Sequence, residues 1–274
     1  MVKLNSGQRF KVEVPLVINI LELINRGLSN IEDIRNNLGI GKNKIETFNY
    51  YLRIMDLVEY ENRQFKLTNF GQYILKFRNN PGIYLPLLFY KLCRGWDNGG
   101  HFYYSRIVNN ILYDKYFSAE NVIDNSEIKK KLMDYEYEND KIDVKLVSLV
   151  TTAISSDDGF GYLGILTRED KNKFSINYYK PELLIAAYII YDNWPINETT
   201  VSLDRVIRDQ YSLGRIFLLT EEDVIPILSK LHQDEYIKIE NKAGLRQIAK
   251  NSNISAESIL EEIYYEYFSN SFSG

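Results

Sequence analysis

The stretch LGIGKNKIETFNYYLRIMDLVEYENRQFKL, residues 38–67, decides the expected fold. It opens on two glycines, Gly39 and Gly41, which can supply the left-handed backbone of a tight turn. A helix is expected from Lys42 to about Asp56, because apolar residues recur there at helical spacing. Directly after it, two short apolar runs flank the polar turn 61–63, a pattern typical of a β-hairpin.

Working outward, helices are expected on both sides of this stretch. Pro15 suits the first turn of a helix that ends before Gly27. A short capped helix is expected over 31–37, and 69–75 reopens a helix after the hairpin. The order helix, helix, glycine turn, helix, hairpin, helix is that of a winged helix-turn-helix, which we predict over residues 1–80.

Two further regions are expected after residue 80. Residues 81–195 are predicted as a helical middle region with a hairpin near 160–180. Residues 196–274 are predicted as a second winged-helix-like region, with a helix over 201–210 and a capping box formed by Thr220 and Asp223. The expected fold class is therefore mainly α with small β-hairpins.

Composition indicates an ordinary soluble protein, since 45% of the 274 residues are apolar and 26% are charged. One cysteine, Cys93, and two histidines cannot build a disulfide framework or a Cys/His zinc site, so no metal and no cofactor is expected. No stretch approaches the ~18 apolar residues of a membrane span, and the first residues show no secretion signal. We expect a cytoplasmic protein without membrane contact.

Charge is distributed unevenly along the chain. The net charge of −4 argues against a protein that coats nucleic acid over its whole surface. Residues 1–80 nevertheless carry 12 Lys and Arg against 8 Asp and Glu, whereas residues 81–274 carry 21 against 29. The N-terminal third is therefore the part best suited to contact a polyanion.

The helix beginning at Lys42 is predicted to present a polar face opposite its apolar stripe. Asn and Thr side chains can pair with base edges, and Lys and Arg can neutralise phosphates. The expected contacts with double-stranded DNA are Lys42, Asn43, Thr47, Tyr50, Arg53, Arg63 and Lys66. Any solvated helix also shows polar residues opposite its apolar side, and Glu46 repels phosphate. A winged helix that contacts only protein therefore stays open as an alternative.

The residue types needed for catalysis do not form a recognisable pattern. His101 lies beside aromatic residues and His232 ends an expected helix, positions that favour structural roles. Cys93 lies within an apolar run, where a packing role is expected. We therefore predict that the protein is not an enzyme and that it has no catalytic residue.

Four short blocks carry a resemblance to a known family. In chain order they are 38–45 (LGIGKNKI), 65–71 (FKLTNFG), 213–217 (LGRIF) and 243–248 (AGLRQI). They resemble the LGVGKNMV, YRLTPLGE, PGRVF and AGLRQL blocks of a prokaryotic family of unknown function, DUF4007. That family usually opens with an element like SGHETF, whereas this sequence has SGQRF with Gln8 in place of the histidine.

The resemblance implies a bacterial or archaeal protein whose relatives accompany DNA phosphorothioation genes and phage-defence clusters. Two arginines in the C-terminal blocks, Arg215 and Arg246, could hold an anion or a partner carboxylate. The alternative is that each fixes local structure by binding backbone carbonyls or a nearby acid. Together these features favour a DNA-binding accessory or regulatory protein of a modification or antiviral defence system. The competing hypothesis is an adaptor that docks on a modification enzyme or ATPase without contacting DNA, and the oligomeric state stays open.

Overall fold

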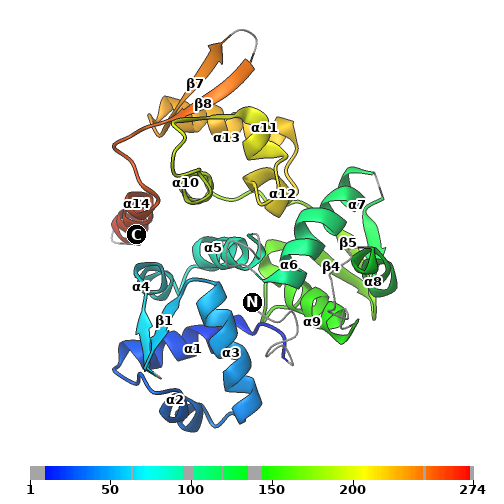
Figure 1. Cartoon of the computed structure of the whole chain (residues 1–274), viewed down its shortest axis with the longest axis vertical. Helices are drawn as coiled ribbons and strands as arrows, with labels where there is room; N and C mark the ends of the chain where they lie inside the picture. Colours follow the sequence, from blue (N-terminus) through cyan, green and yellow to red (C-terminus); the bar gives the residue numbers. More distant parts are fainter. Residues whose placement is uncertain are drawn as a thin grey trace.

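A computed structural model describes residues 10–62, 64–94, 101–118, 120–134, 144–242 and 245–271. This part of the chain is mainly helical, with one two-stranded and two three-stranded antiparallel sheets. The expected class, mainly α with small hairpins, is confirmed. Figure 1 shows three groups of elements arranged around a central helix, α5.

The first unit, residues 14–67, has the element order that the sequence predicts. Its elements, together with the helix α4 that follows them, are α1 (Val14–Asn25), α2 (Ile31–Leu38), α3 (Lys42–Ile54), β1 (Val58–Glu61), β2 (Gln64–Leu67) and α4 (Asn69–Lys76). Asn30 caps α2 by accepting the backbone N–H of Glu32 at 2.8 Å, and Gly39 ends α2 with a left-handed φ of 63°. An isolated bridge joins Asn30 to Gln64 beside the hairpin.

The second unit, residues 102–176, contains more strand than the sequence indicates. Its elements are α6 (Phe102–Arg106), the π-helical turn η2 (Ile107–Leu112), α7 (Tyr113–Phe117), β3 (Val122–Asp124), α8 (Asn125–Met133), α9 (Val144–Ser155), the 3-10 turn η3 (Gly161–Leu163), β4 (Leu166–Asp170) and β5 (Lys173–Ile176). The expected hairpin is β4–β5. β3 pairs with β5 to give the order β3-β5-β4, and three residues are too few for strand alternation to show in the sequence.

The third unit, residues 183–250, precedes a last helix, α14. The elements are α10 (Leu183–Asp192), β6 (Thr200–Ser202), α11 (Leu203–Ile207), α12 (Leu213–Phe217), α13 (Glu221–Gln233), β7 (Ile237–Lys242), β8 (Leu245–Lys250) and α14 (Ala256–Ser271). The capping box of Thr220 and Asp223 is confirmed. The helix expected over 201–210 is present but shorter, as α11, because residues 201–202 belong to β6 and pair with β8.

A similar element order recurs in all three units: helix, strand or bridge, helices, hairpin, with two helices before the hairpin in the first two units and three, α11 to α13, in the third. In the second and third units the last strand of the hairpin lies in the middle of the sheet, as β5 and β8. In the first unit the bridge at Asn30 takes the place of β3 and β6. By this order α10 begins the third unit, although the sequence placed it in the middle region. The expected domain boundaries, 1–80, 81–195 and 196–274, stay a prediction.

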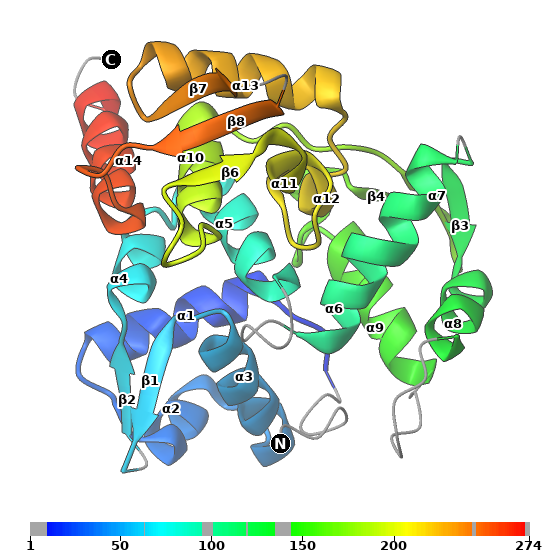
Figure 2. The same ribbon diagram turned by 45° about the horizontal axis from the view of Figure 1, so that its top comes forward.

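The core extends through all three units and centres on α5 (Pro81–Cys93). Eleven of its thirteen residues are buried, so it has no solvent-facing side. It contacts α3 of the first unit, α6 of the second and α10 of the third, and Figure 2 shows it between them. Within the described residues, no helix combines the length and apolar character that crossing a membrane requires.

Gly71→Ala is expected to destabilise the junction between α3 and α4. A Cβ at Gly71 would lie 2.1 Å from the carbonyl oxygen of Leu57, so backbone must move to admit it. Overpacking of this kind costs about 1–3 kcal/mol, which urea unfolding would detect. Gly41→Ala is the matched control, because a Cβ there meets nothing within 4 Å. Equal stability of the two variants would contradict the expectation.

Candidate nucleic-acid interface

Helix α3 is held by one buried side and presents the other to solvent. Ile45, Phe48 and Leu52 are at most 1% exposed and form the buried side. The exposed residues of the helix are Lys42, Asn43, Glu46 and Arg53. At 100° per residue they form one stripe along the helix, about 16 Å long at 1.5 Å per residue. We call these four residues the α3 stripe.

The predicted polar face is turned relative to the observed one. Thr47 is 1% exposed, and its hydroxyl donates to the carbonyl oxygen of Asn43 at 2.9 Å. Tyr50 is half-buried, with its ring centroid 5.8 Å from that of His101. The side of α3 that carries both residues therefore packs within the chain. Thr47 cannot meet a base edge here, and Tyr50 is restricted by its aromatic neighbour.

The cations of α3 differ in their partners. Lys44 points back to the start of the chain, where its Nζ lies 2.9 Å from the Glu13 carboxylate. Lys42 lies 3.9 Å from Glu46, an exposed i,i+4 pair that contributes little to stability. Within the part of the chain that the structure describes, Arg53 makes no ion pair. Arg53 is therefore the cation of the stripe most available to a phosphate.

The β1–β2 hairpin lies next to α3 and carries one exposed cation in the described residues, Lys66. Lys66 is in register with Glu59 on the opposite strand. Phe65 is buried against the helices and fixes the orientation of the hairpin. The predicted contact Arg63 lies outside the described residues.

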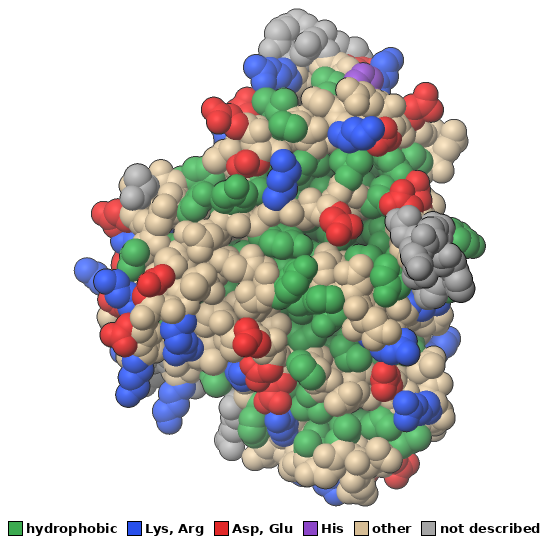
Figure 3. Space-filling view, turned by 180° about the vertical axis from the view of Figure 1, so that it is seen from behind, with side chains coloured by type: hydrophobic (Ala, Val, Ile, Leu, Met, Phe, Trp, Pro, Cys, Tyr) green, Lys and Arg blue, Asp and Glu red, His purple; other side chains and the backbone are tan. Residues whose placement is uncertain are grey.

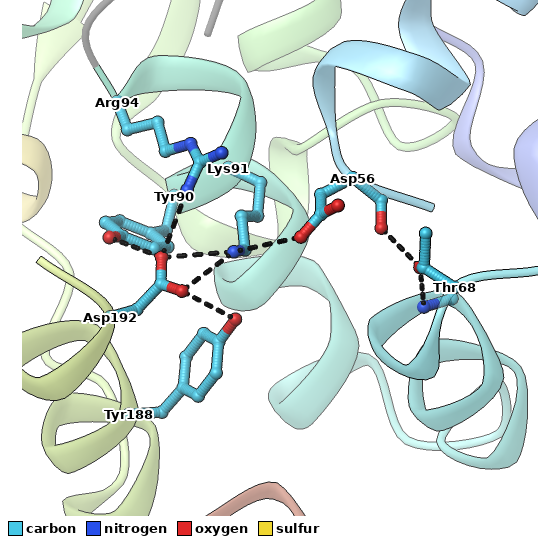
Figure 4. Close-up of polar contacts among 8 residues, drawn as sticks. Asp56, Thr68, Tyr90, Lys91, Arg94, Tyr188 and Asp192 are labelled. Atoms are coloured by element: carbon cyan, nitrogen blue, oxygen red, sulfur yellow. Dashed lines mark hydrogen bonds and ion pairs between the residues drawn. The ribbon is translucent and has the colours of Figure 1, made fainter. Parts of the chain in front are cut away.

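The end of α3 is fixed by Asp56, which turns the chain out of the helix with φ 60°. Its backbone carbonyl accepts the hydroxyl of Thr68, the N-cap of α4, at 2.5 Å. Its carboxylate lies 3.5 Å from Nζ of Lys91 in α5, as Figure 4 shows. The exit of α3 is thereby tied to the helix after the hairpin and to the central helix.

Lys91 forms the centre of a buried polar cluster. Its ammonium is 2% exposed and lies 3.0 Å from both carboxylate oxygens of Asp192, at the end of α10. The same carboxylate accepts the Tyr90 hydroxyl at 2.8 Å and lies 3.3 Å from Nη1 of Arg94. Burial, followed by the Asp192 charge, raises the pKa of Tyr90. These contacts join the first unit, α5 and the third unit in one network (Figure 4).

Lys91→Met is expected to lower the free energy of unfolding by about 3–5 kcal/mol, because it leaves the Asp192 carboxylate without its main counter-charge. Lys91→Met/Asp192→Asn should recover part of that loss. Asp56→Asn is the comparison, since Asp56 is half exposed and its pair is worth at most about 1 kcal/mol. Urea unfolding measures all three, and a Lys91→Met variant as stable as Asp56→Asn would contradict the central role of Lys91.

His101 and Cys93 have surroundings that suit packing. His101 caps α6 by accepting the backbone N–H of Tyr103 at Nδ1, 3.2 Å away, and its ring stacks on Tyr51. Burial lowers the pKa of His101 to about 3, so the ring stays neutral. Burial also raises the pKa of the Cys93 thiol, which disfavours the reactive thiolate.

The two arginines of the C-terminal blocks bind within the chain. Arg215 donates from Nη1 to the carbonyl oxygen of Asn109 and from Nε to that of Arg208, each at 2.7 Å. Arg246, on β8, lies 3.2 Å from the Glu221 carboxylate. Arg215 thus joins the π-helical turn of the second unit to α12 of the third. The geometry of both arginines agrees with the alternative of a local structural role.

A family model described as "Protein of unknown function (DUF4007)" matches residues 23–265. The chain belongs to the DUF4007 family. Two crystal structures of SspB, one of them magnesium-bound, are similar to this DUF4007 chain in fold. The magnesium-bound one has 15% identity and a TM-score of 0.72 and covers 96% of this chain and 88% of its own. The other has 14% identity and a TM-score of 0.74, and it covers 98% of this chain and 89% of its own. Among curated proteins, none matches.

The residues that the structure describes were compared with what a magnesium ion, such as the one named for an SspB structure, would need. Across the described ranges, no three His, Cys, Asp or Glu side chains come together as a metal ion would need. Four carboxylates instead line a groove of about 790 Å³ between α10, the residues just before β7 and α14. Its acidic residues are Glu182, Asp234, Glu262 and Glu266. Burial and the three neighbouring carboxylates raise the pKa of Glu266.

The sequence prediction missed a second group of cations in this DUF4007 chain, on α8, α9 and the β4–β5 hairpin. They are Lys129, Lys130, Lys131, Lys145, Arg168, Lys171 and Lys173. Their signal was present in the run 129–131 and in the charged turn of the predicted hairpin. The sequence prediction overlooked this cluster because charge was summed over all of residues 81–274, where the net value is −8.

Proposed function

We propose that this DUF4007 chain is a DNA-binding accessory or regulatory protein of a prokaryotic DNA-modification or antiviral defence system. The observation that carries the proposal is the α3 stripe, which faces solvent beside the β1–β2 hairpin. Figure 2 shows α3 and the hairpin at the free end of the first unit. The phosphorothioation context and the cytoplasmic location rest on the resemblance and the composition, and no catalytic residue or cofactor is part of the proposal.

The element order of the first unit supports interpreting it as a winged helix-turn-helix. In such domains the third helix enters the major groove and the hairpin approaches the backbone. The α3 stripe places Lys42 and Arg53 at its two ends, where they can reach phosphates on either side of a groove ~12 Å wide. Asn43 can address a base edge, and Glu46 in between disfavours phosphate. The stripe can therefore contact DNA through the cations at its two ends and the amide near its start.

Lys42→Ala/Arg53→Ala is expected to weaken binding to a short DNA duplex and to lower the slope of log affinity against log salt by about 2, one for each lost phosphate contact. Fluorescence anisotropy at several salt concentrations measures both quantities. Lys180→Ala/Lys238→Ala is the matched control, since it removes the same charge from two exposed positions far from α3. Unchanged binding by a folded Lys42→Ala/Arg53→Ala variant would remove the basis for DNA contact through α3.

The groove near α14 favours a second candidate function, a protein–protein adaptor. Its four carboxylates surround an apolar floor that includes Ile83, Leu184 and Ile263. Figure 3 shows hydrophobic side chains exposed on this side of the molecule, with acidic side chains between them. Such a surface complements a basic partner, as a modification enzyme or ATPase that handles DNA would be.

The adaptor hypothesis predicts a stable complex with a protein encoded by a neighbouring gene, without duplex affinity at low salt. Glu182→Gln/Glu266→Gln should weaken that complex, because it removes two charges from the groove. Asp33→Asn/Glu222→Gln is the control, with two exposed carboxylates elsewhere. Co-expression followed by size-exclusion chromatography measures complex formation. A complex that survives the groove variant as well as the control would count against docking there.

A further inference from the structure

The second unit places α9 and the β4–β5 hairpin where the first unit places α3 and β1–β2. The sheet order β3-β5-β4 puts the last strand in the middle, as β8 lies in the third unit. Helix α8 precedes α9 as α2 precedes α3. The face of α9 turned away from the core is thus the topological equivalent of the α3 stripe.

That face of α9 has a chemistry different from the α3 stripe. Lys145 and Ser148 are exposed, and Leu149, Thr152 and Ser155 are half-buried beside them. At 100° per residue these positions fall on one side of the helix. The helix contains no acidic residue, whereas the α3 stripe includes Glu46. Short hydroxyl side chains also let a helix approach a polyanion backbone closely and can donate hydrogen bonds to phosphate.

The hairpin adds cations at the edge of this face. Arg168 on β4 donates from Nη2 to the Thr152 hydroxyl at 3.2 Å, which places its guanidinium against α9. The guanidinium carbon also lies 5.2 Å from the Phe174 ring centroid, so the ring packs against the guanidinium and helps to hold it in place. Lys171 and Lys173 are exposed, at the turn and at the start of β5. Within the described residues, neither ammonium forms an ion pair.

The three units differ in the net charge of their equivalent elements. In the second unit, α8, α9 and 166–176 carry seven cations and three acids, a net +4. The corresponding elements of the first unit, α2, α3 and 58–67, carry six and five, a net +1. Those of the third unit, α11 to α13 and 237–250, carry seven and five, a net +2. Residues 134–143, between α8 and α9, add five acids and one lysine, so the test must use the whole chain.

Figure 3 shows blue side chains gathered at the edge of the molecule where α8 and the β4–β5 hairpin lie. We propose that α8, the outward face of α9 and the β4–β5 hairpin form a second binding surface for duplex DNA. The proposal rests on the proposed DNA-binding function but assigns a site separate from the α3 stripe. A charged, acid-free helix face flanked by unpaired lysines fits the backbone of a duplex better than a protein surface.

Cross-linking from single cysteines separates this site from the α3 stripe. The native Cys93 is fully buried, so an added exposed cysteine can be modified selectively with a photo-activated cross-linker. Ser148→Cys reports on α9, Asn43→Cys on α3, and Ser252→Cys on an exposed loop as the control. A cross-link to a radiolabelled duplex from Ser148→Cys, above the Ser252→Cys level, is the expected result. No cross-link from Ser148→Cys while Asn43→Cys reacts would overturn this inference and leave the α3 proposal standing.

The salt dependence of binding gives an independent readout. Lys171→Ala/Lys173→Ala should lower the slope of log affinity against log salt by about 2, whereas Lys180→Ala/Lys238→Ala should leave it unchanged. Circular dichroism confirms that each variant is folded. If only Lys42→Ala/Arg53→Ala changes the slope, the second-unit surface is refuted. If only the hairpin variant changes it, DNA contact through α3 is refuted and this surface is supported. A chain that binds no duplex at low salt overturns both.

Discussion

A lysine ammonium withdrawn from water, that of Lys91, imposes the strongest constraint on this fold. A buried charge is tolerated only when counter-charges and hydrogen bonds surround it, and Asp192 and Asp56 supply them from two different units. The network is therefore satisfied only when the first unit, α5 and α10 hold one arrangement. Hydrophobic burial along α5 supplies the attraction, and the charge cluster selects the geometry, since apolar surfaces alone can slide against one another.

This constraint explains why the helix that we propose to contact DNA is only partly free. Asp56 ties the end of α3 to α5, and Tyr50 in α3 lies beside His101, which precedes α6. Thr47 is buried and Tyr50 is restricted by its aromatic neighbour, whereas the α3 stripe faces outward in a fixed direction. A rigid presentation of this kind lowers the ordering cost of binding. The same packing that orients α3 also reduces the number of its residues that can contact DNA.

Local signals in the sequence were enough to place capped helices and insufficient to place the short strands β3 and β6. Caps and turns such as Asn30, Gly39 and the Thr220–Asp223 pair act within a few residues, so their helices could be placed from the sequence alone. β3 and β6 exist because β5 and β8 lie beside them, a long-range pairing that three residues do not encode. The position of Tyr50 likewise depends on a neighbour about fifty residues away, His101, rather than on helical period.

The recurrence of one element order suggests how a single scaffold can serve several partners. The order is set by apolar positions, which all three units retain, while the outward residues are free to differ. The first unit has an amide and charged side chains on its outward helix, and the second has hydroxyls and one lysine there. In the third unit the helix before the hairpin, α13, has acids in its first turn, and an acidic groove lies near its end. Basic and acidic side chains gather at different places on the molecule, so the overall value of −4 hides local surfaces of either sign. A protein built this way can hold a polyanion at one end and a basic protein at the other, so the DNA-binding and adaptor hypotheses are compatible in one molecule.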